Sequence, residues 1–339
     1  MRRGWVAYTD PDCGKVRVGI LDWHDSFGDT LASSDYEFDV AGVDWTKTFH
    51  DLGDLKLWVG AFILDDQAFI QSDLTPGNHD AFLFTFDADK PFGDVYSAGF
   101  SFYYIADYGE YSYPTFTPYR SSWDLWVGLR AKADWKPVPV NTFVIFNPGQ
   151  RDNEPGTPFF EHAGWAAKLE AGPICCGHGK FSAQLLYATG DSNPGNGHST
   201  EFRTVAQSYR DNFGSQGYWS YLYITSPNGP ADVKDLGVSL QDRGFGLFTV
   251  QGKYEYPICH RLTGISAAGW LWSDKSNSTG QGKDIGPELA QQFTYDFGGG
   301  LKADIGAALL FTGDFYRASP GAPKPNDLWM VFSRVQLEF

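Results

Sequence analysis

The sequence predicts an all-β fold, a transmembrane antiparallel β-barrel, and three observations support this prediction. Apolar and polar residues alternate in runs of about ten to fifteen residues from Gly14 to Phe339. The connectors between these runs are alternately short and long. Aromatic residues make up 17% of the chain, which is typical of the interface girdles of membrane barrels. Because lipid cannot hydrogen-bond to the backbone, a closed antiparallel sheet is one of only two structures that span a bilayer.

The alternating runs predict fourteen strands, and sixteen is the alternative count because residues 2–9 also alternate. We expect residues 1–13 to form an N-terminal periplasmic segment or partial strand and residues 14–339 to form the barrel. The expected strands cover residues 14–24, 36–49, 54–66, 80–89, 94–107, 122–135, 138–147, 158–171, 179–190, 240–256, 261–273, 285–297, 301–313 and 327–339.

Alternation within a strand assigns its side chains to two faces. In the strand expected at 122–135, Leu125, Val127 and Leu129 share an apolar row, whereas Asp124 and Arg130 belong to the opposite row. Lipid outside and water inside explain both rows. The strand expected at 36–49 changes phase near Gly42, which predicts a β-bulge there.

The connectors fall into two sets that predict the orientation of the barrel. The short set forms turns, and the long set is rich in Gly, Pro, Asn and Asp. We interpret the short set as periplasmic turns and the long set as extracellular loops. The short connectors are 50–53, 90–93, 136–137, 172–178, 257–260 and 298–300. The long connectors are 25–35, 67–79, 108–121, 148–157, 191–239, 274–284 and 314–326.

Composition excludes some classes of protein. The formal net charge of −15 argues against a protein that binds nucleic acid through a basic surface. No run approaches the roughly 18 to 20 apolar residues of a membrane helix. The first residues lack the apolar core of a signal peptide, so we expect a mature or truncated start. An aromatic-rich secreted β-sandwich or lectin is the alternative fold.

Two segments carry a family resemblance. The alternation of Val331, Ser333, Val335, Leu337 and Phe339 resembles the C-terminal assembly signal of Gram-negative outer-membrane barrels. The segment 186–195, with the long connector after it, resembles the alginate-export-type porins. The resemblance implies an outer-membrane location. The uronate conduit of that family is lined by a dense belt of Arg and Lys, whereas the inward rows here mix both signs of charge, so alginate is not implied as cargo.

The expected function is that of a porin, which lets small hydrophilic solutes or ions diffuse passively through its lumen. We expect no enzyme activity, no catalytic residues, no metal and no cofactor. The expected partners are outer-membrane lipid and lipopolysaccharide, the diffusing solutes, and either a homotrimer or a partner protein in the lumen. The charged residues expected to line the pore are Lys56, Asp124, Arg130, Lys132, Asp134, Lys253, Lys302, Asp304 and Arg334.

The connector 191–239 is far longer than the others. Helical spacing over residues 201–210 predicts a loop helix that folds into the pore, where Arg203, Arg210 and Tyr209 would form a constriction. The alternative is a surface loop that caps the mouth of the barrel.

All four cysteines lie in expected periplasmic turns or at a strand start, and the periplasm is oxidising. We therefore predict a rim disulfide in which Cys259 pairs with Cys176 or, as the alternative, with Cys175. A Cys/His metal site that includes His178 and His260 is an alternative, although its spacing matches no common zinc pattern. Free thiols are the third alternative.

Two other functions stay open. The barrel could enclose a periplasmic or multihaem cytochrome as a sheath. It could also be an outer-membrane hydrolase, because Asp22 and His24 resemble the Asp-x-His pair of barrel proteases.

Overall fold

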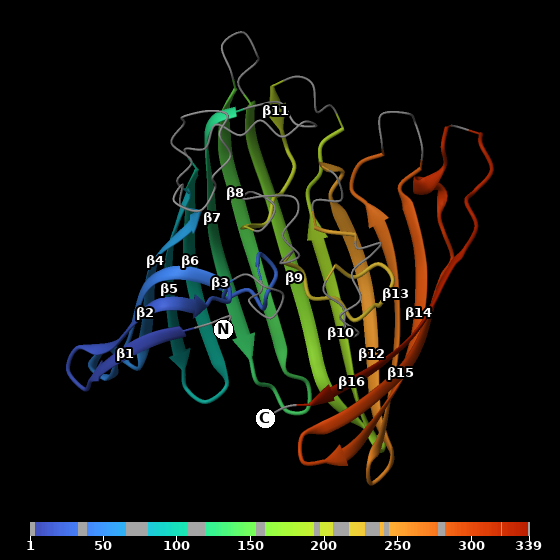
Figure 1. Cartoon of the computed structure of the whole chain (residues 1–339), viewed down its shortest axis with the longest axis horizontal. Coiled ribbons are helices and arrows are strands. Elements are labelled where there is room, and N and C mark those ends of the chain that lie inside the picture. The colour runs from blue at the N-terminus through green and yellow to red at the C-terminus, as the bar shows by residue number, and fades with distance from the viewer. Residues whose placement is uncertain are drawn as a thin grey trace. The chain divides into compact units, whose positions relative to one another are not determined.

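The computed structural model describes residues 4–32, 39–65, 81–107, 119–153, 160–192, 197–205, 217–227, 238–240, 244–276, 282–319 and 321–337. It contains sixteen strands that belong to one sheet (Figure 1). Their bounds are β1 Gly4–Asp10, β2 Gly14–Asp22, β3 Asp39–Phe49, β4 Leu55–Asp65, β5 Ala81–Phe92, β6 Tyr96–Asp107, β7 Tyr119–Ala133, β8 Val140–Asn153, β9 Phe160–Cys176, β10 Gly179–Ala188, β11 His198–Ser199, β12 Leu247–Cys259, β13 Leu262–Ser273, β14 Asp284–Gly298, β15 Leu301–Leu310 and β16 Leu328–Leu337.

The strand order follows the sequence from β1 to β16, except that β11 lies off this path. β11 pairs in parallel with β9, where Ser199 is opposite His162. Single 3₁₀ turns occur at His50–Leu52 and Asp314–Tyr316. Among the described residues, no helix is both long and apolar enough to cross a membrane.

The alternative count of sixteen strands is confirmed, and the preferred count of fourteen is wrong. Each of the fourteen expected strands is present near its expected position. The first additional strand is β1, which pairs with β2 along its whole length. The second is the two-residue β11 inside the long connector, which is too short for an alternation pattern to predict.

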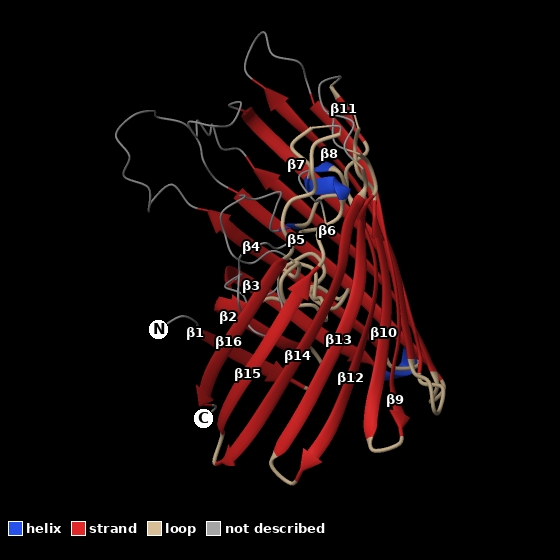
Figure 2. Cartoon of the chain, turned by 90° about the vertical axis from the view of Figure 1, so that its right-hand side faces the viewer, coloured by secondary structure: helices blue, strands red, loops and turns tan. Residues whose placement is uncertain are grey.

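Two strands extend further into the turns than the sequence suggests. β9 continues to Cys176 and β12 to Cys259, although Pro173 and Pro257 interrupt them. Each ladder shifts its register close to that proline. A β-bulge tolerates a proline because the extra residue needs no ladder hydrogen bond. The β9–β10 and β12–β13 turns are therefore shorter than expected. Figure 2 shows the β12–β13 turn and the similarly tight turn between β14 and β15.

The chain forms two compact units, and the same two faces recur in each. The first comprises residues 1–131, 143–165 and 193–217, and the second comprises 132–142, 166–192 and 218–339. We call the faces apolar and polar by the side chains they carry. On the apolar face of the first unit, Val18, Val43 and Phe84 are exposed. On its polar face, Asp44 and Asp87 are buried.

The second unit has the same division of side chains. Ile305, Val331 and Val335 are exposed on its apolar face, and Val335 has 73% of its surface accessible. Glu288 and Asp304 are buried on its polar face. A face that exposes large aliphatic side chains, opposite a face that buries carboxylates, reverses the order of a soluble protein.

The bulge expected near Gly42 is absent. β3 pairs with β2 and with β4 in continuous register through this residue. A Cβ atom on Gly42 would lie 2.2 Å from the carbonyl oxygen of Ala61. The change of phase in the sequence therefore marks a glycine that the neighbouring backbone approaches closely, and not an extra residue.

Replacement of this glycine tests the close approach. Gly42→Ala should lower the free energy of unfolding by about 1–3 kcal/mol, because the added methyl group meets backbone that cannot rotate away. Gly252→Ala is the matched control, since its nearest neighbours are Phe181 ring atoms at 3.4 Å, an ordinary contact. Denaturant unfolding in detergent or lipid measures both. An equal loss of unfolding free energy in the two variants would contradict the close approach of the backbone to Gly42.

Candidate solute pathway

Charged side chains on the polar face of the first unit are held in ion pairs. Arg17 of β2 binds Asp44 of β3 through Nε, at 3.0 Å from Oδ1, and through Nη2, at 2.5 Å from Oδ2. Its Nη1 lies 3.0 Å from Oδ1 of Asp22. The carboxylates of Asp44 and Asp22 therefore share the guanidinium of Arg17. Arginine suits this arrangement because its N–H donors form a planar, rigid fork.

A second arginine, the predicted pore-lining Arg130 of β7, is held in the same way. It donates from Nε and Nη2 to Asp89 at 3.0 and 2.5 Å. Its Nη1 donates to the hydroxyl of Ser101 and lies 3.5 Å from Asp87. Asp87 also accepts a hydrogen bond of 2.7 Å from Tyr103. This part of the polar face carries charge of both signs, and most of its charged side chains form ion pairs.

The connector after β2 folds back onto this face. Asp25 is buried, and its carboxylate accepts the backbone N–H groups of Phe27, Leu31 and Ala32 at 2.7, 2.7 and 3.0 Å. The N–H of Ser26 donates to Tyr103 on β6 at 2.9 Å. Burial raises the pKa of Asp25 to about 7, although the three N–H donors act in the opposite direction.

The beginning of the long connector also lies on the polar face of the first unit. Trp126 of β7 donates from Nε1 to the carbonyl oxygen of Arg203 at 2.7 Å. The N–H of Arg203 donates to Oδ1 of Asn147 on β8 at 2.9 Å. Beside these contacts, the predicted pore-lining Asp124 forms a buried pair with His162, with 2.8 Å between Oδ1 and Nε2. The beginning of the long connector therefore covers the polar face of β7 and β8 around Trp126 and Asn147.

The predicted constriction lies partly within this segment. Arg203 is described and is buried, with its Nε 3.5 Å from Glu201. Tyr209 and Arg210 lie outside the described residues, as does the second half of the helix expected over residues 201–210.

A later part of the long connector lies on the polar face of the second unit, where Glu288 of β14 binds it. Oε1 of Glu288 accepts the N–H groups of Tyr223 and Ile224 at 2.7 and 2.8 Å. Oε2 accepts the N–H and the hydroxyl of Thr225 at 2.9 and 2.8 Å. Because all four bonds go to one fully buried carboxylate, Glu288 fixes the course of this segment.

Neighbouring side chains add to this anchorage. Gln251 of β12 accepts the N–H of Tyr221 at 2.8 Å and donates to the hydroxyl of Tyr218 at 2.6 Å. The Tyr221 hydroxyl donates to Glu170 of β9 at 2.6 Å, and the predicted pore-lining Lys253 lies 5.0 Å from the centroid of the Tyr221 ring. Burial raises the pKa of Tyr218 to about 12. Burial and the Glu170 carboxylate raise the pKa of Tyr221 further, so both phenols stay neutral.

Apart from Lys56, which belongs to the first unit, the remaining predicted pore-lining residues lie in the second unit. Arg334 of β16 donates to Asp304 of β15, with 2.9 Å between Nε and Oδ2. Lys302 is two residues from Asp304 in the same strand and therefore shares its face. Lys132 and Asp134 form an ion pair of 3.2 Å next to a turn, and both are half-exposed.

The side chains that anchor the connectors are absent from the sequence-based prediction. They are Asp25, Asn147, Gln251 and Glu288, and all four accept backbone N–H groups. Strand alternation could have placed Asn147, Gln251 and Glu288 on the polar face. No sequence signal identifies their backbone partners, which are 30 to 65 residues away for Gln251 and Glu288.

The structure does not contain the predicted disulfide. All four cysteines are exposed free thiols. Cys176 pairs with Gly179, and Lys180 beside Gly179 pairs with Glu255 in the next strand. Cys176 and Cys259 are therefore two strands and about three residues apart, roughly 14 Å, whereas a disulfide needs Cα atoms within about 7 Å. Among the described residues, no group of three or more His, Cys, Asp or Glu side chains is arranged to hold a metal ion.

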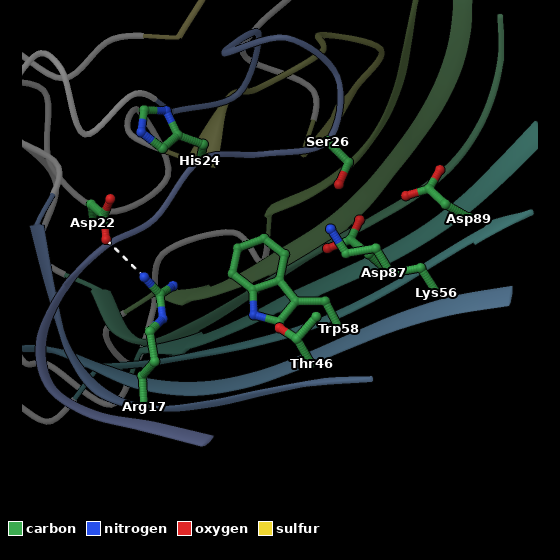
Figure 3. Close-up of a pocket in the computed structure, with 9 residues that line it drawn as sticks. All are labelled: Arg17, Asp22, His24, Ser26, Thr46, Lys56, Trp58, Asp87 and Asp89. Atoms are coloured by element: carbon green, nitrogen blue, oxygen red, sulfur yellow. Dashed lines mark hydrogen bonds and ion pairs between the residues drawn. The ribbon is translucent and has the colours of Figure 1, made fainter. Parts of the chain in front are cut away.

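Two cavities open on the polar face of the first unit. The acidic cavity has a volume of about 370 Å³, and three of its wall residues, Asp22, Asp87 and Asp89, are carboxylates (Figure 3). His24, Ser26 and Trp58 also line it. The basic cavity has a volume of about 460 Å³ and is lined by Lys15, Lys47 and His50 together with Asp10. Arg17, Thr46 and Lys56 line both cavities.

Comparison with known proteins gives a match at the level of structure only. No family model and no curated protein matches the sequence. Three similar solved structures are the outer-membrane porins OccK5 (OpdH) of Pseudomonas aeruginosa, OccAB1 of Acinetobacter baumannii, and OccK2 (OpdF) of P. aeruginosa in complex with glucuronate.

The similarity to these three covers nearly the whole chain. OccK5 is 13% identical, with a TM-score of 0.51 over 96% of this chain and 78% of that one. OccAB1 is 13% identical, with a TM-score of 0.51 over 95% and 74%. OccK2 is 12% identical, with a TM-score of 0.50 over 99% and 81%. At such identities the likeness shows the fold, an outer-membrane-type antiparallel β-barrel.

Removal of the Glu288 anchor should release the segment around residues 223–225. Glu288→Gln replaces one acceptor oxygen by an NH₂ group that faces N–H donors, which should cost about 2–3 kcal/mol of local stability. Hydrogen exchange of the amides of residues 223–225 measures the effect. Glu255→Gln is the matched control, because Glu255 lies on the same unit near the turn end of β12. Unchanged protection in Glu288→Gln would show that other contacts hold the segment.

The docking of the connector after β2 should depend on pH. Because the pKa of Asp25 is raised in the folded state, docking is most stable below about pH 4 and weakens as the pH rises through about 7. Protection of the Leu31 and Ala32 amides, corrected for the intrinsic exchange rate, should fall over this range. Asp25→Ala should abolish most of the protection at every pH, while Asp29→Ala, a partly exposed neighbour, should not. A protection that rises with pH would contradict the raised pKa.

Proposed function

We propose that this chain is an outer-membrane porin of a Gram-negative bacterium, through which small hydrophilic solutes or ions diffuse passively. The observation that carries the proposal is the opposite chemistry of the two faces of the sheet. The apolar face suits lipid, and the polar face with its paired charges suits a water-filled lumen. No chemical step is required, since pore width and the placement of charge set the selectivity.

Aromatic side chains on the apolar face support a membrane-spanning orientation. Trp270 of β13 pairs with Pro287 of β14, and Tyr295 and Phe297 lie eight and ten residues further along β14, next to its turn. All three aromatic rings are exposed. This separation is roughly 27–34 Å along the strand, or roughly 20–26 Å along the membrane normal at a tilt of about 40°. An apolar band of about 25 Å between two aromatic girdles is the hallmark of outer-membrane barrels.

The similar solved structures point to the same class of function. They are outer-membrane porins, and OccK2 was crystallised with glucuronate. Of the properties of these porins, we propose for this chain only the passage of small polar solutes. A closer relation to the alginate-export-type porins rests on the segment 186–195 alone. The mixed charges of the wall, in which Arg17 and Arg130 each contact two carboxylates, differ from the dense basic belt of that family.

The other two candidate functions have less support. A sheath needs a polar face that is free to receive a partner protein, whereas residues of the chain's own connectors occupy that face at Asp25, Asn147 and Glu288. A hydrolase of the Asp-x-His kind needs the aspartate to orient the histidine. Here Asp22 binds Arg17, and Nδ1 of His24 lies 2.8 Å from Asp29. We therefore propose a non-enzymatic channel.

The proposal predicts ion conduction whose selectivity follows the wall charges. In planar bilayers the purified protein should give stepwise conductance, with a modest preference for cations because of the net charge of −15. Arg334→Gln removes the positive charge that pairs with the Asp304 carboxylate, to which Thr294 and Gln292 still donate hydrogen bonds. It should raise the cation-to-anion permeability ratio roughly two-fold, measured from reversal potentials in a salt gradient.

The control for this experiment removes the same charge outside the lumen. Arg261→Gln changes an exposed residue in the turn between β12 and β13 and should shift the reversal potential much less. Absence of conductance from folded, membrane-inserted protein would refute the channel. Equal shifts from both variants would show that the polar face does not line the path of the ions.

A further inference from the structure

The acidic and basic cavities are two halves of one charged site. They share the wall residues Arg17, Thr46 and Lys56. Along β2 the sign of charge changes from Asp22 in the acidic cavity to Lys15 in the basic one. A solute in the shared region therefore has carboxylates on one side and ammonium groups on the other.

Lys56 directs into this region an ammonium group that has no ion-pair partner among the described residues. In the β4–β5 register it is opposite Asp89, the residue with which it would be expected to pair. Arg130 holds both oxygens of Asp89, at 3.0 and 2.5 Å. Lys56 makes no ion pair with any carboxylate in the described part of the chain. Its charge is therefore available to a ligand.

The acidic cavity contains a complementary acceptor. Asp87 is 2% exposed, and its Oδ1 accepts hydrogen bonds from Ser101 and Tyr103. Its Oδ2 is buried and has no hydrogen-bond partner among the residues that the structure describes. Trp58 is opposite Asp87 in the same register, and its Nε1 is a buried donor that likewise has no partner within the described ranges. Figure 3 shows the Trp58 ring between Arg17 and Asp87.

Arg17 does not compete for an anionic ligand, because Asp44 and Asp22 already occupy its guanidinium. The groups left for a ligand are then the ammonium groups of Lys56 and Lys15 and Oδ2 of Asp87, whose other oxygen lies 3.5 Å from Arg130. The Lys15 ammonium lies 5.4 Å from the centroid of the Trp5 ring. Lys56 of β4 is diagonal to Asp87 of β5, which brings such side chains within about 7–8 Å, a span that one small molecule can bridge. Lys15 of β2 lies two strands from Lys56.

Charge complementarity then selects the class of solute. A cation is attracted by Asp22 and Asp87 but repelled by the lysines, and the reverse holds for an anion. A neutral polyol gains hydrogen bonds but satisfies neither charge. A molecule that carries an ammonium and a carboxylate satisfies both, and Trp58 offers an aromatic surface to its side chain.

We propose that the two cavities form a binding site for a zwitterionic solute, a free amino acid or a short peptide. Its ammonium group lies toward Asp87 and Asp22, and its carboxylate lies toward Lys56, with the Thr46 hydroxyl and Lys15 on the next two strands. This inference rests on the proposed channel and names the solutes that the channel favours.

The test compares three solutes that differ in charge but share one skeleton. Uptake of labelled glycine, glycinamide and N-acetylglycine into proteoliposomes separates the zwitterion from the cation and the anion, and a polyol of similar size gives the rate set by size alone. We expect glycine to enter about three to ten times faster than either singly charged analogue, relative to the polyol.

Two variants assign the preference to this site. Lys56→Gln and Asp22→Asn should each reduce the glycine-to-polyol ratio about three-fold or more, while polyol uptake stays within two-fold of the unmodified protein. Lys324→Gln is the matched control, since Lys324 is an exposed lysine in the connector between β15 and β16 of the other unit. It should leave the ratio unchanged.

The outcomes separate this inference from the channel itself. If polyol enters and ions are conducted but the three analogues pass at rates set by size, the zwitterion site is refuted and the channel stands. The site is also refuted if Lys56→Gln behaves like Lys324→Gln, or if N-acetylglycine is preferred to glycine. If neither polyol nor ions pass, the channel and the site are both refuted.

Discussion

A β-strand sends successive side chains to opposite faces, and every other feature of this chain depends on that constraint. With period two, one row of each strand can be aliphatic and the next row charged without any change in the backbone. The apolar row of β16, which includes Val331 and Val335, needs a solvent that tolerates bare hydrocarbon. The polar row, which includes Arg334 on the same strand, needs water or counter-charges. A sheet with these two rows is stable only where two different media meet.

A second constraint is that buried polar groups need hydrogen-bond partners. Connectors that lie on the polar face bring backbone N–H groups out of water, and each needs an acceptor. Asp25 supplies acceptors for three such groups within its own connector, and Glu288 supplies them from the sheet for the long connector. The ion pairs of Arg17 and Arg130 meet the same need for the side chains of the wall. Charge-assisted hydrogen bonds therefore order the buried polar groups, beside apolar contacts such as those of Trp23 and Phe27 with Tyr103.

The strands could be predicted from the sequence because alternation is a local signal. All fourteen expected strands are present, and the alternating Trp5–Thr9 segment correctly raised the alternative of a higher count. Errors occurred where a local signal has two physical causes. Gly42 changes the phase of β3 because of a close backbone approach, which looks like a bulge in the sequence. Conversely, true register shifts near Pro173 and Pro257 carry the strands past residues that look like turn formers.

The site was less accessible to sequence reasoning, because its contacts are distant along the chain. Alternation places Asp304 and Arg334 on one face, but their contact depends on the β15–β16 register. The proposed proximity of Cys176 and Cys259 failed for the same reason, since neighbouring turns do not fix the offset between strands. Nothing in the local pattern around residues 223–225 indicates that a carboxylate 63 to 65 residues later will bind their amides.

The way in which Glu288 holds its connector has a consequence for how such a protein can diversify. Three of its four bonds go to main-chain amides, which every residue except proline possesses. The anchor therefore recognises the path of the chain and is nearly indifferent to which side chains that path displays. Side chains of this connector can therefore be exchanged while the path of its backbone stays the same, so the sequence of the connector and the strand that supports it are free to evolve at separate rates.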